Sequence, residues 1–224
     1  MVRVRRTEEA GMAADPLKLT TAAAVLGLVT ATELLGWLAI RKVAGSPLIW
    51  LGGLRLIQIG AVVWIVARLE KGLAAIGWQV SGWLQGLWKG ALWSAGFGLI
   101  VGCAMLVLHW TGRDPLAIVQ TPLPAAKVDL AAYLVVGGCI APVAEELCFR
   151  GILYTYFRRW GIIPALLGST VIFVALHSTR ALPLTQIVGG IVFAISYEYS
   201  KNLMVPMTIH ALGNLAIFSL SLLN

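Results

Sequence analysis

Long apolar stretches separated by short polar ones dominate the pattern along this chain. About 20 apolar residues cross the hydrocarbon core of a bilayer as an α-helix, and the fifth and sixth stretches are shorter than that while the fourth is longer. The pattern therefore predicts an all-α, polytopic transmembrane helical bundle with about seven spans (six to eight). These spans are Leu19–Ile40, Leu48–Ala67, Gly90–Trp110, Val128–Phe157, Ile162–His177, Leu182–Tyr197 and Leu203–Leu223.

The segment Leu73–Leu87 is too polar to span a membrane. Its tryptophans alternate with Gln and Ser, which is typical of an amphipathic helix lying in the membrane interface. An eighth element packed on the bundle is the alternative. The proline-rich loop Arg113–Lys127 is the clearest break in the chain. We therefore expect a polar N-terminus over residues 1–18, N-terminal helices over residues 19–127, and a motif-rich core over residues 128–224.

Composition supports membrane insertion, because 59% of the residues are hydrophobic and only 12% are charged, against about 25% charged in soluble domains. The net charge of +7 does not indicate nucleic-acid binding, since the basic residues lie between apolar stretches as loop charges do. The segments expected on the same side of the membrane as the N-terminus hold ten basic residues: Arg3, Arg5, Arg6, Lys18, Arg68, Lys71, Lys89, Arg158, Arg159 and Lys201. The opposite loops hold five: Arg41, Lys42, Arg113, Lys127 and Arg180.

This charge bias predicts a multi-pass protein of the cell (plasma) membrane with its N-terminus in the cytoplasm. The three cysteines all lie in apolar stretches, and no two of them form a Cys-x-x-Cys pair. We expect Cys103, Cys139 and Cys148 to be small buried packing residues, because neither a disulfide framework nor a zinc ribbon fits their spacing.

Few polar side chains interrupt the N-terminal spans. Glu33 and Arg55 lie in the first two spans, and we interpret them as a structural ion pair between adjacent helices, since neither belongs to a larger polar cluster in the sequence. His109 sits at the end of a span, in an interfacial position. Gly98 and Gly102 form a Gly-x-x-x-Gly pattern, which is common in helix packing and therefore carries little information.

Polar residues in the C-terminal half follow a different pattern. Three separate spans each carry a pair of chemically distinctive side chains four residues apart, so that the two members of each pair share one helical face. These pairs are Glu146 with Arg150, Phe173 with His177, and His210 with Asn214. Because ionisable groups at membrane depth are costly, we expect the three faces to converge on one buried functional site.

Two adjacent glutamates, Glu145 and Glu146, have different expected roles. Glu146 lies four residues before Arg150, so the two can form an ion pair along the helix. Glu145 is rotated by about 100° from Glu146 and is the freer carboxylate. Such a carboxylate can act as a general base.

Glu-Glu-x-x-x-Arg, Phe-x-x-x-His and His-x-x-x-Asn, each in its own span, resemble the CPBP family over about residues 128–223. That family contains type II CAAX prenyl proteases and bacteriocin-processing or immunity (Abi-like) proteins. The resemblance implies an intramembrane endopeptidase that hydrolyses a peptide bond of a membrane-associated protein or peptide. It also implies roles for seven residues: Glu145 activates water, His177 assists, His210 and Asn214 stabilise the oxyanion, and Glu146, Arg150 and Phe173 support the geometry.

The resemblance leaves metal dependence open. Glu145, His177 and His210 could hold a zinc ion with one open position, although the zincin pattern His-Glu-x-x-His is absent from the sequence. We favour water activated by glutamate with no obligatory cofactor, because Asn214 is a poor zinc ligand and a good oxyanion donor.

Other functions remain as alternatives. A non-catalytic immunity or scaffold protein of the same family would retain the polar cluster for stability. A proton-coupled transporter is less favoured, since no inverted repeat is visible in the sequence. The expected partners are the lipid bilayer and a membrane-associated substrate, with no nucleic acid. Whether the substrate is a prenylated protein, a leader peptide or a sorting tail, and which oligomeric state the protein adopts, cannot be derived from the sequence.

Overall fold

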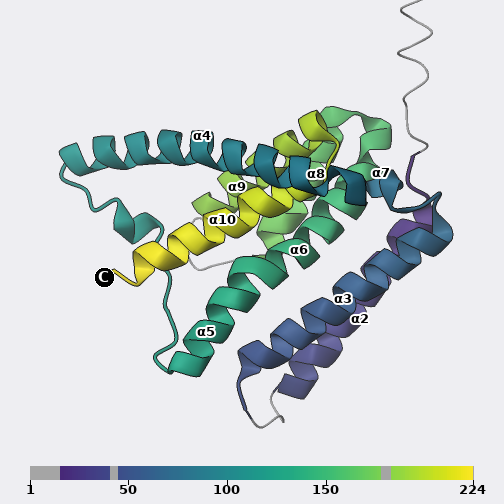
Figure 1. The fold of residues 1–224 in the computed structure, drawn as a ribbon, viewed down its shortest axis with the longest axis horizontal. Coiled ribbons are helices and arrows are strands. Elements are labelled where there is room, and N and C mark those ends of the chain that lie inside the picture. The colour runs from purple at the N-terminus through teal and green to yellow at the C-terminus, as the bar shows by residue number, and fades with distance from the viewer. Residues whose placement is uncertain (1–15, 41–44, 178–182, 224) are drawn as a thin grey trace, which may run out of the picture.

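The computed structural model describes residues 16–40, 45–177 and 183–223 (Figure 1). All seven expected spans are helical, and the described residues form helices and turns without strands. Five helices are long and apolar enough to cross a membrane: Leu19–Ala39, Pro47–Leu69, Val80–Trp110, Lys127–Trp160 and Met204–Ser221. The prediction of an all-α membrane bundle is therefore confirmed. Most of the expected polar N-terminus, and the expected loop charges Arg41, Lys42 and Arg180, lie outside the described residues.

Helices α2 (Leu19–Ile40) and α3 (Pro47–Leu69) form a hairpin on one side of the molecule (Figure 1). Proline at the start of α3 suits a helix N-terminus, because its missing N–H would have no intrahelical partner there. Helix α3 packs against the long helix that runs from residue 127 to 160. The approach is close at Gly52, where a Cβ atom would lie 2.7 Å from Cγ2 of Val136.

The expected amphipathic helix over Leu73–Leu87 is wrong. The chain instead makes two short 3-10 turns, η1 (Leu73–Ile76) and η2 (Val80–Gly82), before α4 (Trp83–Trp110) begins. Gly77 ends η1 with φ at 69°, a left-handed conformation that suits glycine. A Cβ atom at Gly77 would also lie 2.7 Å from the carbonyl oxygen of Lys201, so this turn is packed tightly against the bundle.

The helix from residue 127 to 160 is a composite of α, π and 3-10 segments. In order they are α5 (Lys127–Val135), η4 (Val136–Ile140, π), α6 (Ala141–Glu146), η5 (Leu147–Tyr154, π), α7 (Thr155–Phe157) and η6 (Arg158–Trp160, 3-10). Pro142 in the first turn of α6 has no N–H to donate and its ring crowds the preceding turn, which explains the wider π segment before it. The two π segments thus flank the short helix that carries the glutamate pair.

The remaining helices enclose that composite helix. Helix α8 (Ile162–Leu176) packs against η5 and α9 (Leu184–Ser200), while α10 (Met204–Ser221) packs against α4, α6 and α9 (Figure 1). Glycines allow α4 and α10 to approach closely, since a Cβ atom at Gly86 or Gly90 would lie 2.5 Å from Cβ of Met204 or Thr208 respectively.

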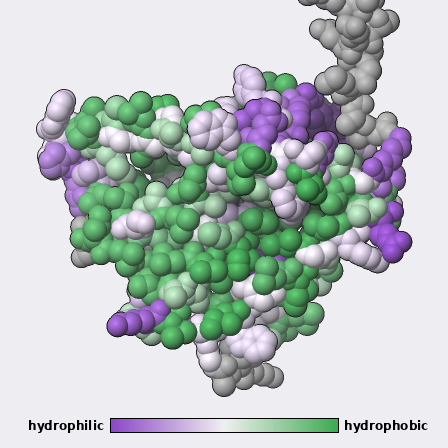
Figure 2. Space-filling model, in the orientation of Figure 1, coloured by the Kyte–Doolittle hydropathy of each residue, from purple (hydrophilic) through white to green (hydrophobic). Residues whose placement is uncertain are grey.

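One end of the bundle is polar, whereas its sides are broadly apolar (Figure 2). Ion pairs and hydrogen bonds link several helix ends there: Lys18 to Glu70, Arg159 to the carbonyl of Leu17, Arg158 and Lys201 to Glu198, and Asn202 to the carbonyl of Gly82. Residues that the sequence placed on one side of the membrane therefore meet at one end of the structure.

The prediction that all three cysteines are buried is wrong for two of them. Cys148 is buried, but Cys103 and Cys139 are exposed on the surface of the bundle. In a membrane protein an apolar neighbourhood in sequence does not imply the protein interior, because side chains that face lipid are as apolar as those that face another helix.

Candidate functional site

Glu146 and Arg150 form the most deeply buried polar pair of the described residues. Both side chains are 0% exposed, and Arg150 donates from Nη1 to Oε1 of Glu146 at 3.0 Å. The predicted ion pair along the helix is confirmed. Arg150 also donates from Nη2 to the carbonyl oxygen of Gly190 at 3.0 Å, so one guanidinium joins η5 to α9. The pair thereby anchors the segment that follows the glutamates.

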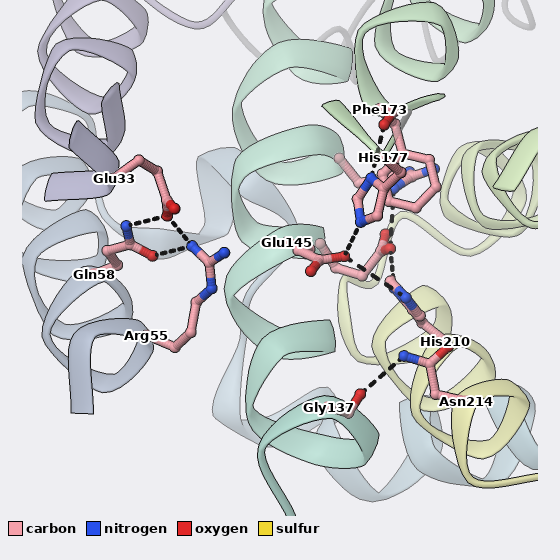
Figure 3. Close-up of polar contacts among 11 residues, drawn as sticks. Glu33, Arg55, Gln58, Gly137, Glu145, Phe173, His177, His210 and Asn214 are labelled. Atoms are coloured by element: carbon pink, nitrogen blue, oxygen red, sulfur yellow. Dashed lines mark hydrogen bonds and ion pairs between the residues drawn. The ribbon is translucent and has the colours of Figure 1, made fainter. Parts of the chain in front are cut away.

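Glu145 faces two histidines from two other helices (Figure 3). Its Oε2 lies 3.4 Å from Nε2 of His177, at the end of α8, and 3.7 Å from Nε2 of His210, in α10. The Glu145 side chain is 17% exposed and that of His177 is 31% exposed, whereas His210 is nearly buried at 7%. The structure therefore brings one carboxylate and two imidazoles together at a point that retains some access from outside.

The other ring nitrogen of each histidine is held by an acceptor. Nδ1 of His177 lies 2.8 Å from the carbonyl oxygen of Phe173, and Nδ1 of His210 lies 2.8 Å from Oε1 of Glu146. Since a carbonyl or carboxylate oxygen accepts, we assign a proton to Nδ1 of each imidazole. Each Nε2 is then directed at Glu145. The role of Glu146 follows, because it orients His210 as well as pairing with Arg150.

Three phenylalanine rings enclose the buried guanidinium. The Cζ atom of Arg150 lies 5.0 Å from the ring centroid of Phe173, 5.2 Å from that of Phe193 and 5.9 Å from that of Phe149. These contacts have cation–π geometry, which partly compensates for desolvation. Phe173 also lies against the ring of His177, with centroids 4.3 Å apart, so the structure places this residue between the ion pair and the imidazole.

Sequence reasoning missed Phe193 and Gly190 of α9. The ring of Phe193 is stacked on His210 with centroids 4.5 Å apart and an interplanar angle of 19°. Gly190 supplies the carbonyl for Arg150, and a Cβ atom there would lie 2.9 Å from Cγ2 of Thr170. The signal available was a Gly-Gly pair followed by an aromatic residue in a span, which is too common to single out.

Asn214 lies one turn after His210 in α10, but its side chain bonds to the composite helix and not to Glu145 or the histidines. Its Nδ2 donates to the carbonyl oxygen of Gly137 in η4 at 2.9 Å (Figure 3). That carbonyl lies within a π segment of the composite helix. An amide nitrogen carries two N–H donors, and this bond uses one of them. Asn214 therefore ties α10 to the helix of the glutamates.

The residues proposed for zinc do not form a metal site as they stand. In the part of the chain that the structure describes, no group of three or more His, Cys, Asp and Glu side chains is placed to hold a metal ion. Glu145, His177 and His210 converge, with the two imidazole Nε2 atoms 3.4 and 3.7 Å from the Glu145 carboxylate. No step of the chemistry below is assigned to a metal.

A second polar cluster lies beside this site. Arg55 pairs with Glu33, as the sequence predicted. However, Gln58 accepts from Nη1 of Arg55 at 2.7 Å and donates to Oε1 of Glu33 at 2.8 Å, and its Nε2 also lies 2.8 Å from the hydroxyl of Thr32. The expectation that the pair belongs to no larger cluster is therefore wrong. The sequence did not reveal the cluster, because Gln58 and Thr32 are uncharged and meet the pair only through the docking of α2 on α3.

A helical membrane bundle whose glutamates and histidines meet in the interior defines a class, namely integral membrane proteins with a buried cluster of ionisable side chains. Residues 127–216 match the family model described as Type II CAAX prenyl endopeptidase Rce1-like. This segment of the chain is similar to a family of peptidases, and it contains Glu145, His177, His210 and Asn214. Searches of curated proteins and of solved structures gave no match.

Proposed function

We propose that the protein is an intramembrane endopeptidase in which Glu145 activates the attacking water. The observation that carries this proposal is the convergence of both Nε2 atoms, from His177 and His210, on Oε2 of Glu145. A general base needs hydrogen-bond reach to a water and a neighbour able to share its proton. The partial exposure of Glu145 and His177 leaves room for water and peptide to reach them.

In the proposed first step, Glu145 removes a proton from water while the water oxygen bonds to the peptide carbonyl carbon. His177, with its Nε2 lone pair 3.4 Å from the carboxylate, shares that proton. The oxyanion accepts hydrogen bonds from His210 in its imidazolium form, through Nε2–H, and from the second N–H of Asn214. The carboxylate of Glu146 holds the ring of His210 in place through Nδ1.

In the second step the tetrahedral intermediate collapses and the carbon–nitrogen bond breaks. The proton held by Glu145 and His177 passes to the leaving nitrogen, so the products are a carboxylic acid and an amine and the base is restored. Glu146, Arg150 and Phe173 take no part in bond making. They hold the two imidazoles in position, through the Nδ1 contacts and the packing of Phe173 between Arg150 and His177.

We propose a membrane-associated protein or peptide as the substrate, because the site lies within the apolar bundle. The family description names prenylated CAAX proteins, and a prenylated tail, a leader peptide and a sorting tail all present a peptide bond next to the membrane. We further propose that the protein resides in the cell membrane with its N-terminus and polar end in the cytoplasm, that it acts without an obligatory cofactor, and that it binds no nucleic acid.

The test compares membrane peptides from cells that contain wild-type protein with those from cells that contain Glu145→Gln or His177→Ala. Cleavage products should disappear with either variant, and purified variants should process the precursor at least about 100-fold more slowly. Glu198→Gln is the matched control, because it removes a partly buried carboxylate at the polar end, away from the site.

Full function of the Glu145→Gln protein in cells would overturn the proposal. It would favour the alternative, in which this family member acts as a non-catalytic immunity or scaffold protein and retains its polar cluster for stability.

A further inference from the structure

The guanidinium of Arg55 is held through Nη1, whereas its Nε makes no hydrogen bond to any described residue. Its Nη1 donates to both Glu33 and Gln58. Its Nε is buried and, among the described residues, has no hydrogen-bond partner. The edge formed by Nε and Nη2 is the edge that binds planar oxygen groups in two parallel hydrogen bonds.

A buried donor without a partner is costly, above all at membrane depth. Leaving it unsatisfied forfeits the full desolvation cost of the group, and no water is present in the hydrocarbon core to compensate. A structural ion pair needs only the side of Arg55 that already faces Glu33. The vacant edge therefore points to a ligand with an oxygen acceptor.

Arg55 lies on the side of α3 that faces the site. Helix α3 packs against η4 and α6, the segments next to and including the glutamates. In Figure 3 the second terminal nitrogen of Arg55 points away from Glu33, toward the helix that carries Glu145. A peptide held at this edge would therefore lie against the helix that carries the proposed base.

We propose that Arg55 is a substrate-binding residue, whose Nε–Nη2 edge binds a main-chain oxygen of the peptide beside the bond to be cut. This inference rests on the proposed endopeptidase function and names the part of the site that holds its substrate. Glu33 and Gln58 fix the guanidinium in the orientation that presents this edge. An extended peptide needs such a partner, because its backbone carbonyls lose their water on entering the bilayer.

Two sources can supply the oxygen, namely an internal peptide carbonyl or the free carboxylate at the end of the substrate. Both are planar oxygen acceptors that a guanidinium edge binds, the carboxylate in bidentate fashion. They differ in charge, so the pair of substrates used in the test distinguishes them.

The experiment measures kcat and KM in reconstituted protein with a precursor peptide whose C-terminus is either free or amidated. The charge-neutral double variant Glu33→Gln/Arg55→Gln should raise KM by about 10-fold or more with a smaller change in kcat. If the carboxylate is the ligand, wild type should prefer the free peptide and the variant should lose that preference. If a carbonyl is the ligand, KM should rise equally for both peptides.

Arg158→Gln/Glu198→Gln is the matched control, because it also neutralises an ion pair between two helices, but at the polar end of the bundle. Its KM should stay within about twofold of wild type. If the Glu33/Arg55 double variant does not fold, Arg55→Lys replaces it, since lysine retains the charge but lacks the two-nitrogen edge. KM unchanged in the folded variant for both peptides overturns the inference. Absence of cleavage by wild type overturns the proposed function instead.

Discussion

Glu146 shows at the scale of single residues how one carboxylate organises the site. Its Oε1 accepts from Arg150 at 3.0 Å and from Nδ1 of His210 at 2.8 Å, so two helices depend on one oxygen atom. Its Oε2 is buried and has no hydrogen-bond partner within the described part of the chain. The neighbouring Glu145 has neither of these contacts and faces Nε2 of both histidines. Adjacent residues of the same type thus have separate tasks.

Removal of one member of the buried pair should be costly. Arg150→Met should lower the free energy of unfolding by about 3–5 kcal/mol, because it leaves the charge of Glu146 uncompensated. Glu146→Gln/Arg150→Met should recover most of that loss, since no net charge then remains buried. Cleavage should stay low in the double variant, because methionine cannot make the bond to the Gly190 carbonyl that anchors this segment to α9. Denaturation in detergent micelles measures stability, and equal stability of the single variant and wild type would contradict this account.

The donor set around Glu145 also leads to a prediction about metal removal. Because the proposed mechanism activates water through Glu145 and uses Asn214, a poor zinc ligand, as an oxyanion donor, treatment with a zinc chelator such as 1,10-phenanthroline should leave cleavage within about twofold of the untreated rate. The check is a peptide-cleavage assay before and after chelation. Loss of activity that returns on addition of zinc would instead support a metal-dependent peptidase.

At the scale of elements, the composite helix and the pair α4–α10 explain why the site is built here. Helix α6 begins with Pro142 in its first turn and is a short α-helical segment between two wider π segments. Helix α10 carries His210 and is held against α4 through Gly86 and Gly90. The Gly-x-x-x-Gly pattern of Gly98 and Gly102 makes no such approach, since a Cβ atom at either position would meet nothing within 4 Å.

Substitutions of alanine for glycine along α4 should therefore change the stability of the protein in opposite directions, depending on the position. Gly90→Ala should destabilise the protein by about 1–3 kcal/mol, because the new methyl would lie 2.5 Å from Cβ of Thr208 and 2.9 Å from the carbonyl oxygen of Val205. Gly98→Ala should stabilise it by about 0.5–1 kcal/mol through helix propensity alone. Thermal unfolding of the two purified variants makes the comparison. A destabilised Gly98→Ala together with a neutral Gly90→Ala would refute the packing described for this helix pair.

At the scale of the whole molecule, charge and hydropathy define an orientation. The helix ends joined by Lys18, Glu70, Arg158 and Glu198 lie at one polar end, and broad apolar sides extend away from it (Figure 2). Four of the basic residues that the sequence assigned to the cytoplasm are found at this end, namely Lys18, Arg158, Arg159 and Lys201. We propose that this end faces the cytoplasm, because cytoplasmic loops carry an excess of Lys and Arg.

The orientation can be tested with single cysteines in a protein whose native cysteines are replaced by serine. In intact cells, a maleimide that does not cross membranes should label Asp114→Cys and should not label Gln79→Cys until the cells are opened. Both positions are exposed loop residues. A difference in labelling between them therefore reports the side of the membrane on which each lies. The reverse labelling pattern would show that the N-terminus is outside.

Much of the site was predictable where the signal was local. Glu146 and Arg150 pair within one turn of the same helix, and the other site residues stand out because polar groups are rare in these spans. The packed 3-10 turns between Leu73 and Gly82 were not predictable, because the tryptophans and glutamines of this segment suit an interface helix and a packed turn equally well. The left-handed Gly77 and its tight contact with the Lys201 carbonyl decide between the two.

The sequence by itself determined that this protein is a bundle of membrane helices, because in hydrocarbon every backbone group must be bonded within its own segment. It also determined which rare polar residues a site could use. Only the tertiary structure decided which apolar residues face lipid, as for Cys103 and Cys139, and which uncharged residues join the polar groups, as for Gln58, Gly190 and Phe193. The physical reason is that lipid and protein interior are equally apolar. Hydropathy therefore does not show which face of a helix contacts lipid and which contacts another helix.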